Sequence, residues 1–420
     1  MGSFFIEGIS NLEGIVEIGG SKNAALPIIA STVLNGREYI IENIPDIEDV
    51  RMMFDILTSM GCTAQFERGL ALIDTRGLNT HSVPEKLVRK IRSSIILMGA
   101  ILGRTGNVEV AYPGGCEIGL RPIDLHLKGL KKLGVDIQEK NGILYGKVNN
   151  SVGCEISLDY PSVGATENIM LFAVRAQGST VIYNAAREPE IVDLQNFLIK
   201  CGYNISGAGT STITIEGNKI NSADTIDYKI ISDRIEAGTY LSAAATMRSK
   251  IYIKNIEKSH FKSITSLYED AGCEIRETHN TIIVTNEKRI NALEKISTQP
   301  YPGFPTDMQA QFMASMATAN GATIIEETVF DSRYKHVPEL QKMGADITTI
   351  GRVAVVNGVM RLHGAEVDAR DLRGGASLVI AAIGAEGMTR VNNIYHINRG
   401  YEHFMEKLRK LGVIITVDEQ

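Results

Sequence analysis

The sequence predicts an α/β fold with two domains, each built from three repeated units in which apolar helices lie inside and sheets cover them. Three observations support this prediction: a Leu-x-x-x-Gly landmark that recurs about every 70 residues, one strongly apolar helix-like stretch in each repeat, and strand-like segments beside it. One helix and its sheet cannot close a hydrophobic core, whereas three such pairs around an axis can. The repeats that fill the 420 residues therefore predict two domains of three repeats each.

The landmark ends a helix-like stretch in every repeat. A glycine just after a helix allows the left-handed backbone that stops the helix, and the residue four positions earlier packs the last turn. The pairs are Leu57 and Gly61, Leu130 and Gly134, Leu198 and Gly202, Tyr268 and Gly272, Leu340 and Gly344, and Leu408 and Gly412. Their even spacing indicates that these helix ends are equivalent positions of one repeated fold.

Each repeat also contains a second, more apolar helix. These helices begin near Asn23, Arg92, Ala165, Ile235, Asp307 and Gly375. They are apolar on most faces, so we expect them to be buried all round. A strand-like stretch follows each one, at 38–44, 107–113, 179–185, 250–256, 322–328 and 388–394.

The domain boundaries follow from the strand-like segment 3–18. It precedes the first helix and has no repeat of its own, so we expect it to join the second domain. The predicted first domain is residues 22–230, which include Cys116. The predicted second domain is residues 1–21 together with 231–420.

Composition excludes several classes of partner. The formal net charge is −6, and no run of Lys and Arg is long enough for a nucleic-acid-binding stripe. The N-terminus does not resemble a signal peptide, and the apolar runs fall short of a membrane span, so we expect no membrane partner. Five cysteines without a C-x-x-C motif, and eight histidines without metal-ligand spacing, predict a cytoplasmic protein with no bound metal.

The segment 113–126, PGGCEIGLRPIDLH, carries the strongest local signal of chemistry. Its prolines and glycines keep Cys116 out of regular structure. Arg121 and Asp124 follow closely, and a guanidinium near a thiol on a loop lowers the pKa of the thiol and makes it reactive. The alternative is a free surface cysteine on a turn, because a lone Cys is a weak signal. We expect the remaining cysteines to be structural, small and often buried: Cys62, Cys154, Cys201 and Cys273.

Polar residues gather at the predicted N-termini of the apolar helices. Unpaired N–H groups and the positive end of the helix dipole make such termini suitable for anions. Capping explains Ser162, Thr306 and Asp371, because Ser, Thr and Asp are favoured there. Capping does not explain the cations, which the dipole disfavours: Lys22, Arg92, Arg234 and Arg373. We therefore expect an anion-binding face on each domain, and two such faces across a cleft would hold a ligand with several anionic groups.

Eight segments along the whole chain carry a family resemblance. They are GGSKNAALP (19–27), PGGCEIGLRPIDLHL (113–127), PSVGATENIM (161–170), NAAREPEIVD (184–193), PGFPTDMQAQF (302–312), RYKHVPELQKMGADI (333–347), DLRGGASLVIAA (371–382) and YHINRGYE (395–402). Together they resemble the UDP-N-acetylglucosamine 1-carboxyvinyltransferases, a family of enolpyruvyl transferases. The resemblance implies an inside-out α/β barrel fold with two three-repeat domains around a cleft.

The resemblance also implies an activity. That activity is transfer of the enolpyruvyl group of phosphoenolpyruvate to the 3'-hydroxyl of UDP-N-acetylglucosamine, with release of phosphate and without a cofactor. It would be the first committed step of peptidoglycan synthesis. Fosfomycin, a small epoxide phosphonate, is the inhibitor that the resemblance implies.

The family roles pass to matched residues of this chain. Lys22, Arg121 and Arg399 resemble the cations that hold the phosphate and carboxylate groups, and Asp307 resembles the carboxylate that acts as general base. Cys116 resembles the cysteine that protonates the methylene carbon and forms a thioether adduct. The resemblance implies contacts with the UDP-sugar for Arg92, Arg121, Pro122, Ile123, Asp124, Leu125, Ser162, Val163, Gly164 and Val329. It implies supporting places in the site for Asn23, Arg333, Asp371 and Arg373.

Three alternative functions stay open. Enolpyruvyl transfer to shikimate 3-phosphate is disfavoured by the segments 113–116 and 161–166. An RNA 3'-phosphate cyclase-like ligase has similar repeats, but the net charge of −6 disfavours it. A non-catalytic paralogue that binds UDP-sugar as a regulator is disfavoured by the presence of Lys22, Cys116, Asp307 and Arg399. Tyr160 departs from the resemblance, because some family members have a basic residue there.

Overall fold

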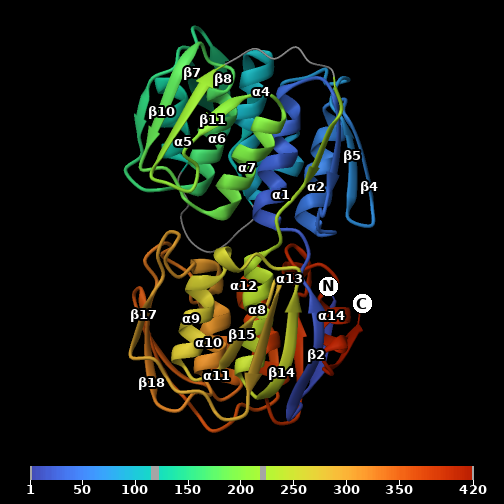
Figure 1. Cartoon of the computed structure of the whole chain (residues 1–420), viewed down its shortest axis with the longest axis vertical. Coiled ribbons are helices and arrows are strands. Elements are labelled where there is room, and N and C mark those ends of the chain that lie inside the picture. The colour runs from blue at the N-terminus through green and yellow to red at the C-terminus, as the bar shows by residue number, and fades with distance from the viewer. Residues whose placement is uncertain (1, 115–122, 218–223, 419–420) are drawn as a thin grey trace. The chain divides into compact units, whose positions relative to one another are not determined.

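The computed structural model describes residues 2–114, 123–217 and 224–418 (Figure 1). Their contacts divide the chain into two compact units. The described parts of Gly20–Cys116 and Arg121–Ile231 form the N-terminal unit, and the described parts of Met1–Gly19 and Ser232–Gln420 form the C-terminal unit. Each unit has a hydrophobic core of its own.

Three apolar helices form the inside of the N-terminal unit: α1 (Lys22–Ser31), α4 (Leu97–Thr105) and α6 (Val163–Ala173). α4 packs against both α1 and α6. The 3-10 turn η1 (Thr32–Leu34) continues α1, and η2 (Arg92–Ile96) precedes α4. More amphipathic helices lie further out: α2 (Glu48–Ser59), α5 (Asp124–Lys132), α7 (Pro189–Lys200) and the short α3 (Glu85–Val88).

Three sheets cover these helices, as the upper part of Figure 1 shows. The first has the order β13 (Ile226–Lys229), β3 (Glu38–Glu42), β5 (Leu70–Asp74), β4 (Thr63–Glu67). The second is β6 (Asn107–Ala111), β8 (Ile143–Val148), β7 (Val135–Lys140). The third is β11 (Asn204–Ser206), β12 (Thr212–Gly217), β10 (Gly178–Tyr183), β9 (Glu155–Ser157). β13 pairs in parallel with β3, so the end of the third repeat completes the sheet of the first.

The C-terminal unit repeats this plan. Its inner helices, which pack on one another in all three pairs, are α8 (Arg234–Ala245), α10 (Gln309–Met316) and α12 (Leu372–Ile383). The 3-10 turns are η3 (Lys258–His260), before α9, and η4 (Thr306–Met308), before α10. The other helices are α9 (Lys262–Asp270), α11 (Val337–Lys342), α14 (Phe404–Lys410) and the short α13 (Tyr395–Asn398). The predicted burial of the apolar helices is confirmed in both units.

The N-terminal strands complete two sheets of the C-terminal unit. One sheet is β15 (Glu274–Glu277), β16 (Thr281–Asn286), β14 (Arg248–Lys254), β2 (Asn11–Glu17), in which β2 is parallel to β14. Another is β21 (Glu366–Asp368), β22 (Met388–Asn392), β1 (Ser3–Glu7), β23 (Ile414–Asp418), in which β1 lies between β22 and β23. The third is β17 (Lys295–Ser297), β18 (Ala322–Glu326), β20 (Val353–Asn357), β19 (Asp346–Ile350).

The landmark glycines all have the left-handed backbone that their position predicts. The values of φ run from +89° at Gly134 to +103° at Gly272. The paired residue four positions earlier is fully buried in each repeat, for example Leu57 and Tyr268. These helix ends are therefore equivalent in structure, and the prediction from their spacing is confirmed.

A second equivalent position follows the strand after the inner helix. In four repeats it holds an asparagine with φ between 55° and 60°: Asn43, Asn184, Asn255 and Asn393. Three of the side chains donate to backbone carbonyls: Asn43 Nδ2 to Ile230 O, Asn184 Nδ2 to Leu158 O, and Asn255 Nδ2 to Ile18 O. Asn393 Nδ2 donates to a side chain, at Asp368 Oδ1. In the fifth repeat the corresponding residue is Glu327.

Two features are absent from the described residues. None of their helices is both long enough and apolar enough to cross a membrane. Within the same residues, no three His, Cys, Asp or Glu side chains are grouped so that they could hold a metal ion.

Candidate active site

Serine side chains cap two of the inner helices of the N-terminal unit, α1 and α6. Ser21 Oγ accepts a hydrogen bond from Ala24 N at the start of α1, and Ser162 Oγ accepts one from Ala165 N at the start of α6. The predicted capping role of Ser162 is therefore confirmed. Val163 and Gly164, which open α6, are partly exposed, as is Asn23 in α1. These termini present backbone N–H groups toward any ligand that reaches them.

Lys22 is paired with a carboxylate that the sequence did not single out. Its Nζ lies 2.6 Å from Asp49 Oδ2 in the first turn of α2. The side chains are 12% and 4% exposed, so this is a nearly buried ion pair. A cation at a helix N-terminus is thus balanced within the protein, and its ammonium is held in one place.

A buried polar network lies beneath the Ser162–Gly164 segment. Asn168, inside α6, donates from Nδ2 to Ile95 O and accepts from Gly99 N, which joins α6 to η2 and α4. Asn168 Nδ2 is also 3.0 Å from Nδ1 of the buried His126 in α5. A Cβ on Gly164 would lie 3.1 Å from His126 Cε1, so the imidazole supports the backbone at the start of α6.

The remaining predicted residues of this unit lie on neighbouring elements. Arg92 opens η2 and is partly buried. Ile123 is buried, while Asp124 and Leu125, in the first turn of α5, are exposed and partly exposed. Glu167, also missed in the sequence, is fully buried in α6, and burial together with Glu190 and Glu188 raises its pKa well above the ordinary value.

Asp307 is the centre of the polar site in the C-terminal unit. Arg333 Nη2 donates to its Oδ1 at 2.7 Å, and Arg373 Nη2 donates to its Oδ2 at 3.2 Å. Both arginine side chains are nearly fully buried, whereas the carboxylate is 28% exposed. Two fixed guanidinium groups therefore orient a carboxylate that is still partly exposed.

The start of α12 holds Arg373 in place. Asp371 caps the helix, because its Oδ1 accepts from Arg373 N and Gly374 N. The Arg373 guanidinium lies over the Tyr401 ring, 5.2 Å from its centroid. Burial by itself lowers the pKa of Arg373, but Tyr401, Asp307 and Asp233 outweigh it and raise that pKa, so the group stays charged.

His336 is a further buried group beside this cap. It precedes α11, and a Cβ on Gly374 would lie 3.1 Å from His336 Cβ. Burial lowers its pKa to about 4, against the opposing effect of the Asp371 charge. The imidazole is therefore neutral at physiological pH.

One predicted role in this unit is wrong. Thr306 does not cap a helix, because the N-cap of η4 is Pro305 and makes no side-chain cap. The Thr306 hydroxyl instead donates to Glu327 Oε2 at 2.9 Å. The hydroxyl therefore acts as a donor to a buried carboxylate, not as the acceptor that a helix cap would need. Val329 is partly exposed just after β18, and Arg399 is partly buried just after α13.

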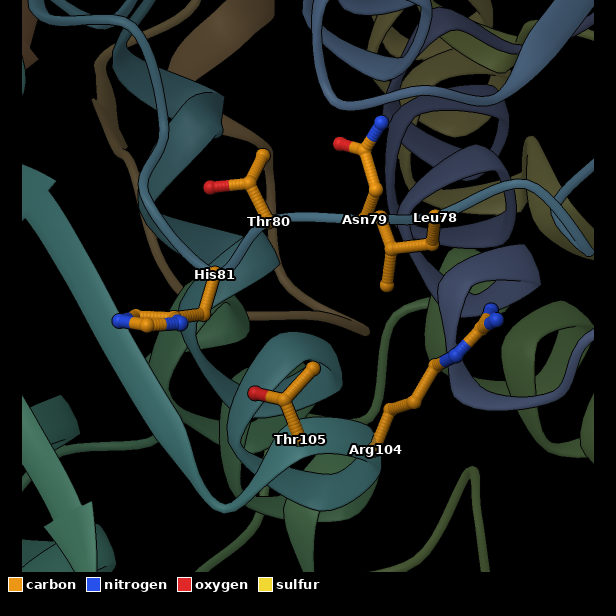
Figure 2. Close-up of a pocket in the computed structure, with 6 residues that line it drawn as sticks. All are labelled: Leu78, Asn79, Thr80, His81, Arg104 and Thr105. Carbon is orange, nitrogen blue, oxygen red and sulfur yellow. The ribbon is translucent and has the colours of Figure 1, made fainter.

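Cys116, Arg121 and Pro122 lie outside the described residues. The described cysteines match the prediction that they are structural: Cys62, Cys201 and Cys273 are buried, and Cys154 is half-buried. A pocket among the described residues has none of the predicted site residues in its lining (Figure 2). It joins the loop of Leu78 and His81 to the C-terminal end of α4, where Arg104 Nη1 donates to Val33 O.

Comparison with known families gives a match over almost the whole chain. The profile of the EPSP synthase (3-phosphoshikimate 1-carboxyvinyltransferase) family matches residues 6–408. A UDP-N-acetylglucosamine 1-carboxyvinyltransferase 2 of Caldanaerobacter subterraneus subsp. tengcongensis is 49% identical over 416 residues, which cover 99% of each chain. A UDP-N-acetylglucosamine 1-carboxyvinyltransferase of Thermotoga maritima is 46% identical over 422 residues and covers both chains completely.

Solved structures share the fold. The enolpyruvyl transferase NikO from Streptomyces tendae superposes with a TM-score of 0.90 over 99% of this chain and 98% of its own, at 24% identity. An EPSP synthase from Acinetobacter baumannii gives a TM-score of 0.76 over the full length of both chains, at 16% identity. The predicted fold class is therefore confirmed.

Proposed function

The chain belongs to the UDP-N-acetylglucosamine 1-carboxyvinyltransferase family of enolpyruvyl transferases, and we propose that it makes the first committed product of peptidoglycan synthesis. It transfers the enolpyruvyl group of phosphoenolpyruvate to the 3'-hydroxyl of UDP-N-acetylglucosamine and releases inorganic phosphate. The observation that carries this proposal in the structure is the Asp307 carboxylate, which two buried arginines orient and which is still partly exposed.

Asp307 suits the role of general base. A hydroxyl must lose its proton as its oxygen bonds to C2 of phosphoenolpyruvate, and an oriented carboxylate can take that proton. Arg333 and Arg373 occupy one lone pair on each carboxylate oxygen. These two bonds hold the carboxylate in one orientation, and its partial exposure lets a substrate hydroxyl approach it.

Cations and an acid complete the reaction. Lys22, fixed by Asp49, supplies a point charge for the anionic groups of phosphoenolpyruvate, and Arg121 and Arg399 add guanidinium groups. Cys116 protonates C3, the methylene carbon, as the acceptor oxygen adds to C2. Loss of phosphate from C2 and of a proton from C3 then restores the double bond in the enolpyruvyl ether.

The UDP-sugar contacts are proposed for the segments that open α5, η2 and α6. Arg92 supplies charge for the diphosphate, and the N–H groups of Val163 and Gly164 supply donors. The Ser162 N–H donates to Tyr160 O, so Ser162 would contribute its side chain. The proposed contacts also include Arg121, Pro122, Ile123, Asp124, Leu125 and Val329. We propose a cytoplasmic location, because the four described cysteines are free thiols, as a reducing compartment requires.

Phosphate release tests the proposal. Purified protein is incubated with phosphoenolpyruvate alone, with UDP-N-acetylglucosamine, or with shikimate 3-phosphate, and the product is identified by mass spectrometry. The proposal expects phosphate and an enolpyruvyl ether only with the UDP-sugar. Release with shikimate 3-phosphate would instead support the sister reaction. Binding of UDP-N-acetylglucosamine without any release would support a regulatory paralogue.

A further inference from the structure

We propose that Glu327 is a positioning residue that fixes the segment of Asp307 and the segment of Val329 to each other. Glu327 lies directly after β18, and its side chain is 1% exposed. The inference rests on the proposed function, because Asp307 and Val329 are site residues only under that function. Glu327 itself has no proposed contact with substrate.

The carboxylate of Glu327 gathers donors from three segments. Its Oε1 accepts from Thr298 Oγ1 at 2.9 Å, Val329 N at 2.9 Å and Phe330 N at 3.1 Å. Its Oε2 accepts from Thr306 Oγ1 at 2.9 Å. Hydrogen bonds to a charged, buried acceptor are stronger than neutral ones, so these segments are held together by one group.

The hydrogen bond between Thr306 and Glu327 is connected to the proposed base, Asp307, through few contacts. Thr306 precedes Asp307, and Arg333 Nη2 donates both to Thr306 O at 3.2 Å and to Asp307 Oδ1 at 2.7 Å. The Arg333 guanidinium lies over the Phe330 ring, 5.3 Å from its centroid. Because Phe330 N is itself bound to Glu327, the contacts form a closed circuit, which Asp307 joins through its bond to Arg333.

Comparison among the repeats shows whether the fold itself requires a carboxylate at the position of Glu327. Four other repeats place an asparagine at the equivalent position, with a left-handed backbone and a side chain that donates. Glu327 instead accepts, and it is not among the residues with positive φ. Four other repeats therefore form the same fold without a carboxylate at this position. The fold does not require the carboxylate of Glu327, so we assign its role to the fifth repeat, which also carries Asp307.

Two substitutions of Thr306 isolate the bond. Thr306→Val keeps the shape and removes the donor, which also leaves Glu327 Oε2 without this partner, whereas Thr306→Ser keeps the hydroxyl. A matched control is Thr389→Val, because the Thr389 hydroxyl is buried in β22 and has no hydrogen-bond partner among the described residues. All variants are assayed well below their melting temperatures.

The first readout is steady-state kinetics. We expect Thr306→Val to lower kcat about tenfold while the Kd for UDP-N-acetylglucosamine, measured by calorimetry, changes less than about threefold. Thr306→Ser and Thr389→Val are expected to stay within about twofold of the wild type. A normal kcat in folded Thr306→Val, or an equal loss in Thr306→Ser, would overturn the inference.

The second readout does not need activity. Amide hydrogen exchange, followed by mass spectrometry, should speed up in both 303–312 and 327–332 in Thr306→Val, and in neither segment in Thr389→Val. Faster exchange in 303–312 alone would show that the segments are not coupled and would overturn the inference. If the wild-type protein releases no phosphate, the proposed function fails, and the exchange data still decide whether Glu327 couples the segments.

Discussion

Lys22 Nζ lies 2.6 Å from Asp49 Oδ2, and neither side chain is more than 12% exposed. Lys22 carries a charge at the N-terminal end of α1, where the helix dipole disfavours it. The Asp49 carboxylate offsets this cost and limits the rotamers of a flexible side chain. The pair therefore accounts for the position of a cation that the proposed reaction needs.

Asp49→Asn is predicted to weaken the use of phosphoenolpyruvate. The amide keeps the shape but removes the charge that anchors the ammonium, so kcat/KM for phosphoenolpyruvate should fall at least about tenfold. The measurement varies phosphoenolpyruvate at saturating UDP-N-acetylglucosamine. Asp46→Asn is the control, because Asp46 pairs with Arg51 on the surface, and it should change little. Equal values for the two variants would contradict a role for Asp49.

Asp307→Asn is predicted to slow turnover strongly while the fold and substrate binding are kept. The base is lost, so kcat should fall by roughly two or more orders of magnitude. The amide also turns its NH2 toward Arg333 or Arg373, both of which are donors, so a small loss of thermal stability is expected. Single-turnover kinetics and calorimetry with the UDP-sugar measure the two effects. Near-normal turnover would remove Asp307 from the role of base.

The repeats could be predicted from the sequence because the residues that mark them depend on local backbone conformation. A left-handed residue after a helix favours glycine at one position, and that need recurs at Gly61, Gly272 and the other landmarks. The pairing of β13 with β3 had no such signal. It joins Ile226 to Tyr39, residues far apart in the chain, and depends on how the repeats close around their helices.

Only part of the candidate site could be predicted from the sequence, because only some of its residues stand in a recognisable local pattern. Arg373 and Asp371 stand at the start of an apolar helix, which a pattern can show. Asp49 stands in the first turn of an amphipathic helix, where an acidic residue is ordinary, so nothing marked it as the partner of Lys22. Glu327 and His336 became distinct only through burial, which tertiary packing creates.

His336 is predicted to make stability depend on pH. Its pKa is about 4 in the folded protein, against 6.5 as the ordinary value. Between these values the unfolded chain binds a proton that the folded chain does not, so stability is lost as pH falls from 6.5 toward 4. The full effect is about 3 kcal/mol. Asp193 acts in the opposite direction, because burial raises its pKa to about 6.

A comparison of the His336→Phe variant with the wild type isolates the contribution of His336 to the pH dependence of stability. His336→Phe keeps a ring of similar size, and the contribution of Asp193 cancels when it is compared with the wild type. Urea unfolding at pH 7, 6 and 5 should show a smaller loss of stability in the variant than in the wild type. Parallel curves for the two proteins would contradict the assignment.

The last prediction concerns selective alkylation of Cys116. Burial raises the pKa of Cys62 to about 11 and the pKa values of Cys201 and Cys273 to about 12, and it also raises the pKa of Cys154. Those thiols are therefore almost wholly protonated at pH 7.5 and react slowly, because the thiolate is the nucleophile. Cys116, which Arg121 follows in the sequence, is the cysteine left to react. Fosfomycin should label Cys116 alone, and faster with UDP-N-acetylglucosamine present.

Two variants separate the acid from the nucleophile. Cys116→Asp should keep turnover, because a carboxylic acid can protonate the methylene carbon, and should resist fosfomycin, because the thiolate is absent. Cys116→Ser should lose most activity, since a hydroxyl is a far weaker acid than a thiol. Intact-mass measurement and peptide mapping locate the label, and phosphate release gives the turnover. Labelling at any of the other four cysteines, or a fully active Cys116→Ser enzyme, would show that Cys116 is not the proton donor.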